Sequence, residues 1–201
     1  MRTKLFLSAL CFVLPLMVSA QQKETFKLDK SNLLVKGTSS LHDWEMEAKD
    51  VSCYTATEFE NNELKTFESI SFVCKSNSLK SEHSMMDDKA YDALKVKKHP
   101  EIIFKLDASS IKNNTDRDFD GLLKGTLTLS GVSKKIEVPV TGTLSSSNQF
   151  EAKGSLSLKM SDYDIDPPTA MFGTITTGDK ITVEYDFIFT KTSSPVLSEN
   201  N

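Results

Sequence analysis

The sequence contains few histidines and cysteines, three of each, and both residue types are common in metal sites and in nucleophilic catalysis. Its three histidines, His42, His83 and His99, are scattered and lack the spacing of metal ligands. None of its many serines lies in a Gly-x-Ser-x-Gly motif, and no pair of acid and base residues converges in the sequence pattern. We therefore expect no metal site, no cofactor, no catalytic residue and no enzymatic activity.

Long apolar runs are also missing after the first twenty residues, and a membrane-spanning helix needs about 20 of them. The first twenty residues begin with Arg2 and Lys4, continue with an apolar run from Leu5 to Val18, and end in small residues. This pattern predicts a signal peptide at residues 1–20 that is cleaved near Ala20. We expect a periplasmic or otherwise exported protein without a transmembrane segment in the mature chain.

The chain also lacks an excess of positive charge. Removal of the signal peptide leaves 22 basic residues against 28 acidic ones, a formal charge of −6, which disfavours nucleic-acid binding. The length fits one domain with a sizeable core, at residues 21–192, followed by a flexible tail at 193–201.

Only two cysteines, Cys53 and Cys74, remain after the signal peptide. An oxidising compartment makes a disulfide between them possible, and both lie in segments that we expect to be neighbouring strands. Two buried free thiols are the alternative. We expect the two cysteines to be close enough to form the bridge.

The stretch from Gly121 to Leu144 has the clearest pattern in the chain. Apolar residues alternate with polar ones in two runs, which are separated by the polar turn Ser130-Gly131-Val132-Ser133. Period two indicates β-strands, and Gly131 adopts positive φ at little cost, so the stretch predicts an antiparallel hairpin with one apolar face. A hairpin of this length must belong to a larger sheet that covers its apolar face.

The same alternation recurs along the rest of the mature chain and predicts about eight strands. One short helix is expected between the third and fourth strands, within Ser81 to Val96, where Ser84 and Asp87 have the spacing of a helix cap and Met86, Ala90 and Leu94 form one apolar stripe. Eight long antiparallel strands favour an all-β up-and-down barrel, because closure removes the sheet edges. A two-sheet sandwich is the second choice.

Four stretches resemble the YceI-like family of exported lipid-binding proteins. They are Leu94 to Phe104 (LKVKKHPEIIF), Lys124 to Lys134 (KGTLTLSGVSK), Lys159 to Ile165 (KMSDYDI) and Gly178 to Val183 (GDKITV). The resemblance implies a lipocalin-like barrel, a capping helix and an interior that accepts a long isoprenoid chain. The amino-terminal stretch Gly37 to Trp44 (GTSSLHDW) departs from the more common form of the family, so the ligand's identity stays open.

Small residues on the predicted inner face, such as Ala108, Gly125, Ala152 and Gly154, favour a cavity over a solid core. We expect in-phase apolar side chains to line it: Trp44, Phe72, Phe104, Leu127, Val138, Leu158, Met160, Val183 and Phe187.

The expected function is to hold an isoprenoid-type lipid, a quinone-like chain or another long apolar ligand, for carriage or sequestration. An envelope stress or structural protein without a ligand is one alternative, and a lipid-modifying enzyme is another.

Two other features leave alternatives open. The lysines Lys95, Lys97 and Lys98 are either solvated or meet an anionic head group at a barrel mouth. The pair Met171-Phe172 either folds onto the barrel end or makes a transient membrane or partner contact, and a homodimer is also possible.

Overall fold

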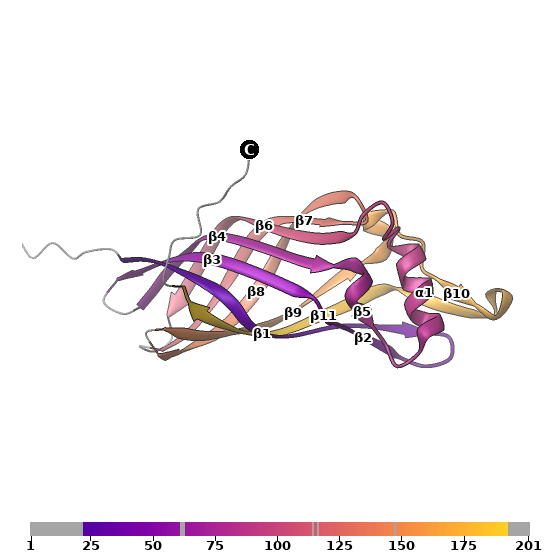
Figure 1. Ribbon diagram of the computed structural model, residues 1–201, viewed down its shortest axis with the longest axis horizontal. Helices are drawn as coiled ribbons and strands as arrows, with labels where there is room; N and C mark the ends of the chain where they lie inside the picture. Colours follow the sequence, from indigo (N-terminus) through magenta and orange to yellow (C-terminus); the bar gives the residue numbers. More distant parts are fainter. Residues whose placement is uncertain (1–21, 61–62, 114, 116, 147, 193–201) are drawn as a thin grey trace, which may run out of the picture.

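The computed structural model describes residues 22–60, 63–113, 115, 117–146 and 148–192. It shows an elongated antiparallel β-barrel with α1 (Ser84–Ala93) at one end and the first and last described residues at the other (Figure 1). The predicted signal peptide and the predicted tail at 193–201 lie outside the described residues. No helix among the described residues is both long and apolar enough to cross a membrane.

Eight long strands close the barrel, in the spatial order β11-β9-β8-β7-β6-β4-β3-β1, and β1 pairs again with β11. The all-β barrel class predicted from the alternation is confirmed. The eight strands are β1 (Gln22–Ser39), β3 (Val51–Glu60), β4 (Glu63–Lys75), β6 (Glu101–Asn113), β7 (Asp118–Leu129), β8 (Val132–Ser146), β9 (Gln149–Lys159) and β11 (Ile175–Lys191). Three short strands extend the helix end: β2 (Trp44–Ala48), β5 (Leu79–Lys80) and β10 (Thr169–Ala170).

The first strand, β1, is continuous although polar residues follow Leu28. It accommodates them with a register shift between Leu28 and Lys30 in its pairing with β11. A bulge of this kind accommodates an extra residue without ending the strand. The next two strands, β2 and β3, are separated by Lys49 and Asp50.

The hairpin that dominates the sequence pattern is formed by β7 and β8. Its turn consists of Ser130 and Gly131, with φ of 52° and 82°. Two consecutive residues of positive φ match the right-handed twist of the flanking strands. A Cβ at residue 131 would lie 2.4 Å from the ring of His99, so any other residue there would have to displace this ring in addition to adopting the positive φ.

The helix lies between β5 and β6, and it follows the third long strand, β4. Its predicted cap is wrong, because the N-cap is His83 and no side chain caps the first turn. Asp87 instead reaches outside the helix and accepts hydrogen bonds from the backbone N–H and the hydroxyl of Ser81, at 2.7 and 2.8 Å. The predicted apolar stripe is confirmed, since its three residues pack against the barrel core.

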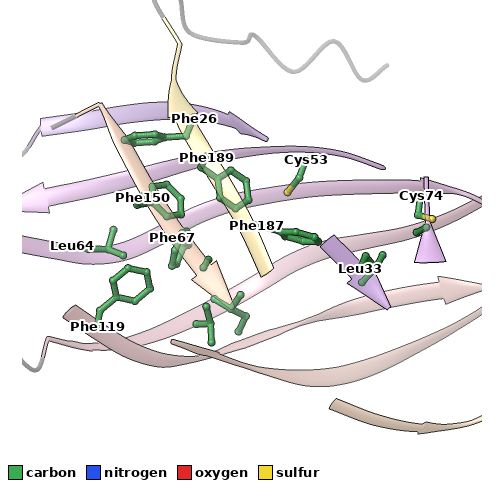
Figure 2. Packing of buried hydrophobic residues seen from close by; sticks show 14 of the residues in the cluster. Phe26, Leu33, Cys53, Leu64, Phe67, Cys74, Phe119, Phe150, Phe187 and Phe189 are labelled. Carbon is green, nitrogen blue, oxygen red and sulfur yellow. The ribbon is translucent and has the colours of Figure 1, made fainter. Parts of the chain in front are cut away.

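Aromatic side chains fill the end of the barrel opposite the helix. Phe150 is 1% exposed and its ring lies 5.0 Å from that of Phe26 and 4.7 Å from that of Phe189. Phe67 and Phe119 pack edge-on against the same ring (Figure 2). We call Phe26, Phe67, Phe119, Phe150 and Phe189 the aromatic plug. Each of them lies near the end of its strand, in β1, β4, β7, β9 or β11, and together they close this end of the barrel.

The two cysteines are buried free thiols, so the disulfide is not formed. Cys53 on β3 is opposite Phe72, and Cys74 on β4 is opposite Val51, which makes the cysteines diagonal neighbours (Figure 2). The Cα atoms of diagonal neighbours in a sheet are about 7–8 Å apart, whereas the Cα atoms of a disulfide are usually about 4.4–6.8 Å apart. No bridge joins the two cysteines, because neighbouring strands do not by themselves bring two residues into register.

Candidate ligand-binding site

A cavity of about 990 Å³ occupies the barrel between the aromatic plug and the helix end. Its lining is almost wholly apolar and is drawn from all eight long strands and from α1. Period two is the local cause, because each strand turns every second side chain inward. A volume near the upper end of the range for ligand pockets, about 300–1,000 Å³, is large enough for an extended apolar molecule.

All nine residues that the sequence predicts for the cavity lie in its lining. They are Trp44, Phe72, Phe104, Leu127, Val138, Leu158, Met160, Val183 and Phe187. The structure thus brings together residues from β2, β4, β6, β7, β8, β9, β11 and the turn that follows β9. Trp44 has a fixed orientation, because its indole N–H donates to the carbonyl of Thr38 at 3.0 Å.

The sequence reasoning missed a part of the lining that comes from the first strands. Leu33, Val35, Met46 and Ile70 also face the cavity. Met46 and Ile70 are in phase with Trp44 and Phe72, so alternation alone could have found them. The two β1 residues were hidden by the polar interruption, which the bulge accommodates.

Tyr185 is a further missed residue, and it brings a polar group to the cavity wall. Its hydroxyl donates to the carbonyl oxygen of Pro139 at 2.5 Å, and its ring lies 5.3 Å from that of Phe187. Burial raises the pKa of the Tyr185 hydroxyl well above its ordinary value, so this group stays protonated.

The cavity has few groups that could act chemically. Its two thiols are inert, because burial raises the pKa of Cys53 to about 12 and that of Cys74 to about 11. His42, His83 and Lys89 lie in the lining near the helix end, and the His42 ring is hydrogen-bonded to the Asp43 carbonyl at 2.7 Å. No group of three or more His, Cys, Asp or Glu residues comes together as a metal site in the described part of the chain. The arrangement is suited to holding an apolar molecule.

The mouth of the cavity carries exposed apolar side chains. Leu41, Met85, Met171 and Phe172 are 67%, 81%, 68% and 110% exposed, and all four are part of the cavity lining. They come from the β1–β2 connection, the start of α1 and the segment after β10, which lie at the helix end of the barrel (Figure 1). The pair Met171-Phe172 therefore projects at the mouth and does not fold onto the barrel end.

The basic cluster at the exit of α1 is not part of the cavity. Lys95 donates to the backbone carbonyl of Asp164 at 2.9 Å, which ties the end of the helix to the loop after β9. Lys97 and Lys98 are exposed, and none of the three lysines lines the cavity.

Comparison with solved structures finds the same fold in several bacterial proteins. BcnA of Burkholderia cenocepacia superimposes with a TM-score of 0.63 at 18% identity, covering 80% of this chain and 98% of that one. A polyisoprenoid binding domain from Saccharophagus degradans gives 0.61 at 14% identity, over 83% and 98% of the two chains. A YceI protein of Campylobacter jejuni gives 0.53 at 20% identity, over 74% and 85%.

No curated protein matches the sequence. The family model of the YceI-like domain, in contrast, matches residues 24–189, which span the barrel from β1 to β11. On this match and the shared fold, the chain belongs to the YceI-like family.

Proposed function

We propose that this protein is exported and holds a long apolar chain, of the isoprenoid or quinone type, inside its barrel for carriage or sequestration. The observation that carries the proposal is the cavity of about 990 Å³ with its continuous apolar lining. Burial of an extended hydrocarbon chain there removes apolar surface from water, which stabilises the complex by about 25 cal/mol per Å² of buried surface. A structural neighbour described as a polyisoprenoid binding domain supports the same class of ligand.

The alternatives account for the cavity less well. A stress or structural protein that acts only through its outer surface has no use for a large apolar hollow, which lacks the dispersion contacts of a packed core. A lipid-modifying enzyme needs an activated nucleophile or an acid–base pair, whereas the cavity thiols are held protonated by burial. We therefore assign binding and no catalytic step.

The exposed side chains at the mouth support a transient contact with a membrane during loading. Met171 and Phe172 lie in the connection between β10 and β11, and both side chains are exposed there. An apolar ligand that moves from a bilayer past such side chains has less exposure to water than one that crosses a polar rim.

The test uses an inner and an outer position on the same strand. Ile70 lines the cavity on β4, and Ser71, the next residue, is exposed. Ile70→Trp should fill part of the cavity and lower the lipid that organic extraction and mass spectrometry recover from the purified protein, with little loss of stability. Ser71→Trp should leave the recovered lipid unchanged.

A solid interior would respond in the opposite way. The larger side chain would then overpack the core and cost roughly 1–3 kcal/mol of unfolding free energy. That loss in the Ile70→Trp protein, together with no extractable lipid and no binding of an added isoprenoid such as farnesol to the unmodified protein, would rule out the carrier function.

A further inference from the structure

The wall of the barrel has a seam between β8 and β9. The two strands pair from Thr141 opposite Lys153 to Ser146 opposite Gln149. Within the described residues, no ladder pair joins 132–140 of β8 to 154–159 of β9, although both segments remain strands and pair with their other neighbours. The barrel is therefore closed along this half by side chains and not by backbone hydrogen bonds.

Three residues explain where the seam begins. Pro139 lacks an N–H group and cannot donate to a ladder. Its carbonyl oxygen lies 2.3 Å from the position that a Cβ on Gly154 would take, so only glycine fits at the point where the strands diverge. The carbonyl oxygen of Pro139 accepts a hydrogen bond from the hydroxyl of Tyr185 in place of one from a neighbouring strand.

A second hollow, of about 560 Å³, lies along the seam. Ile136, Leu156 and Leu158 line both this hollow and the large cavity. Three side chains thus separate the two spaces, and a ligand whose chain fills the cavity has its shortest lateral route to the surface between them.

The hollow is rich in positive charge on a chain that is acidic overall. Its lining includes four lysines and two carboxylates. The lysines are Lys134, Lys135, Lys159 and Lys180. Lys159 and Lys180 are exposed and directly opposite each other on β9 and β11, an arrangement of like charges that destabilises a sheet when nothing lies between them.

The nearby carboxylates compensate only part of this charge. Lys135 is paired with Asp107 at 2.7 Å, and Glu137 is paired with Lys124 at 2.8 Å. Among the described residues, Lys134, Lys159 and Lys180 form no ion pair, although Lys159 is near enough to Asp179 to help lower the pKa of that carboxyl group. Asp162 is the one acid of the lining without an ion pair in this part of the chain.

A buried polar group in the same hollow also lacks a partner. Tyr163 is 1% exposed, and its hydroxyl forms no hydrogen bond. A buried hydroxyl without a partner costs roughly 1–3 kcal/mol, and native proteins rarely retain one. An anion held between the lysines would offer this hydroxyl an acceptor.

We propose that the seam hollow binds the anionic head group, of the phosphate class, of an amphiphile whose apolar chain occupies the cavity. The inference rests on the proposed function, because the chain must be in the cavity for its head group to reach the seam. The lysines supply the positive charge, Tyr163 supplies a hydrogen bond, and the absence of ladder pairing provides the passage.

Two isoprenoids with the same chain test this assignment, namely farnesyl diphosphate and farnesol, titrated calorimetrically at low ionic strength. The unmodified protein should bind farnesyl diphosphate more tightly. The double variant Lys159→Gln with Lys180→Gln should bind farnesyl diphosphate about tenfold more weakly or worse, as expected for the loss of a charge-assisted hydrogen bond. Its affinity for farnesol should be unchanged. The double variant Lys27→Gln with Lys30→Gln, which neutralises two exposed lysines on β1, is the control and should leave the affinity for both ligands unchanged.

The variant Tyr163→Phe tests the contribution of the hydroxyl apart from that of the lysine charges. It should lower the affinity for farnesyl diphosphate but not the affinity for farnesol. The protein should lose no stability, because the hydroxyl that is removed has no hydrogen-bond partner in the structure. Inorganic diphosphate alone should bind far more weakly than farnesyl diphosphate. Equal binding would show a free-anion site unconnected with the cavity, and it would overturn the proposal.

The proposed carrier function and the proposed seam site would be contradicted by different results. If neither ligand binds the unmodified protein, the proposed function itself is wrong. If farnesol binds, but the diphosphate binds no more tightly or is unaffected by the Lys159 and Lys180 substitutions, the seam site is wrong and the apolar carrier remains.

Discussion

At the scale of single residues, the two buried thiols connect the cavity with the stability of the protein. Desolvation raises the pKa of Cys53 to about 12 and that of Cys74 to about 11, from a usual 9.0. The Ser78 hydroxyl, 3.9 Å from the Cys74 sulfur, offsets a part of the shift at Cys74. Both thiols are therefore neutral in the folded protein at pH values where they ionise in the unfolded chain.

The sign of the resulting pH dependence follows from proton binding. Between about pH 9 and 11 the folded protein retains protons that the unfolded chain loses, so unfolding becomes easier as the pH rises. We expect each thiol to lower the free energy of unfolding by up to roughly 1.4 kcal/mol per pH unit in this range. Urea unfolding at a series of pH values measures the slope. The double variant Cys53→Ala with Cys74→Ala should show a smaller one, and an unchanged slope would show that the thiols do not contribute.

At the scale of elements, two side chains, Asp87 and Tyr91, hold α1 at the barrel mouth. Burial alone would raise the pKa of Asp87, but the two hydrogen bonds from Ser81 and the ion pair with Lys80 at 3.3 Å hold it below its ordinary value. Tyr91 adds a second anchor, since its hydroxyl donates to the carbonyl of Leu79 at 2.9 Å. Both contacts bind the helix to the segment around β5.

Asp87→Ala should loosen the helix, because it leaves the Ser81 N–H without its acceptor. We expect a loss of roughly 1–3 kcal/mol in unfolding free energy, the usual effect of removing a hydrogen-bonded charge, together with faster amide exchange in residues 84–93. Asp88→Ala, at the exposed neighbouring position, should change little. Because the pKa of Asp87 is lowered, its contribution is present above its ordinary value of 3.8 and is lost as the pH falls through the folded-state pKa. The difference between Asp87→Ala and the unmodified protein should accordingly shrink in acid.

The helix also shows what local sequence can predict. The four-residue spacing of Met86, Ala90 and Leu94 located the helix and its buried face. The spacing of Ser84 and Asp87 suggested a capping box, but the stronger partners of Asp87 lie upstream in the chain. Competition between a local and a tertiary hydrogen bond is not visible in a sequence window, so the cap could not be predicted.

At the scale of the whole molecule, the barrel interior is divided into a packed half and a hollow half. Strand alternation predicted the inward-facing residues, including all nine of the proposed cavity lining. It did not predict that the five phenylalanines of the aromatic plug gather at one end, because period two is the same in both halves. Nor did it predict the seam, since β8 and β9 each have the pattern of a paired strand and only their register shows that they diverge.

The packed half should supply much of the stability. Phe150→Ala removes the central ring of the aromatic plug, and we expect a loss of roughly 3–5 kcal/mol in unfolding free energy. Phe172→Ala, at the exposed mouth, should cost less than about 0.5 kcal/mol. Chemical denaturation of the two variants measures both values. Equal losses would mean that the plug does not act as the core of the barrel.

The first and last strands enter and leave the barrel at the aromatic plug, with Gln22 and Lys191 at the end opposite α1 (Figure 1). A tether attached beyond either residue would pull on the packed half and point the open mouth away from its support. The protein is thus suited to immobilisation through either terminus on a sensor chip or a resin, where vesicles and dissolved isoprenoids would reach the cavity without passing the anchor.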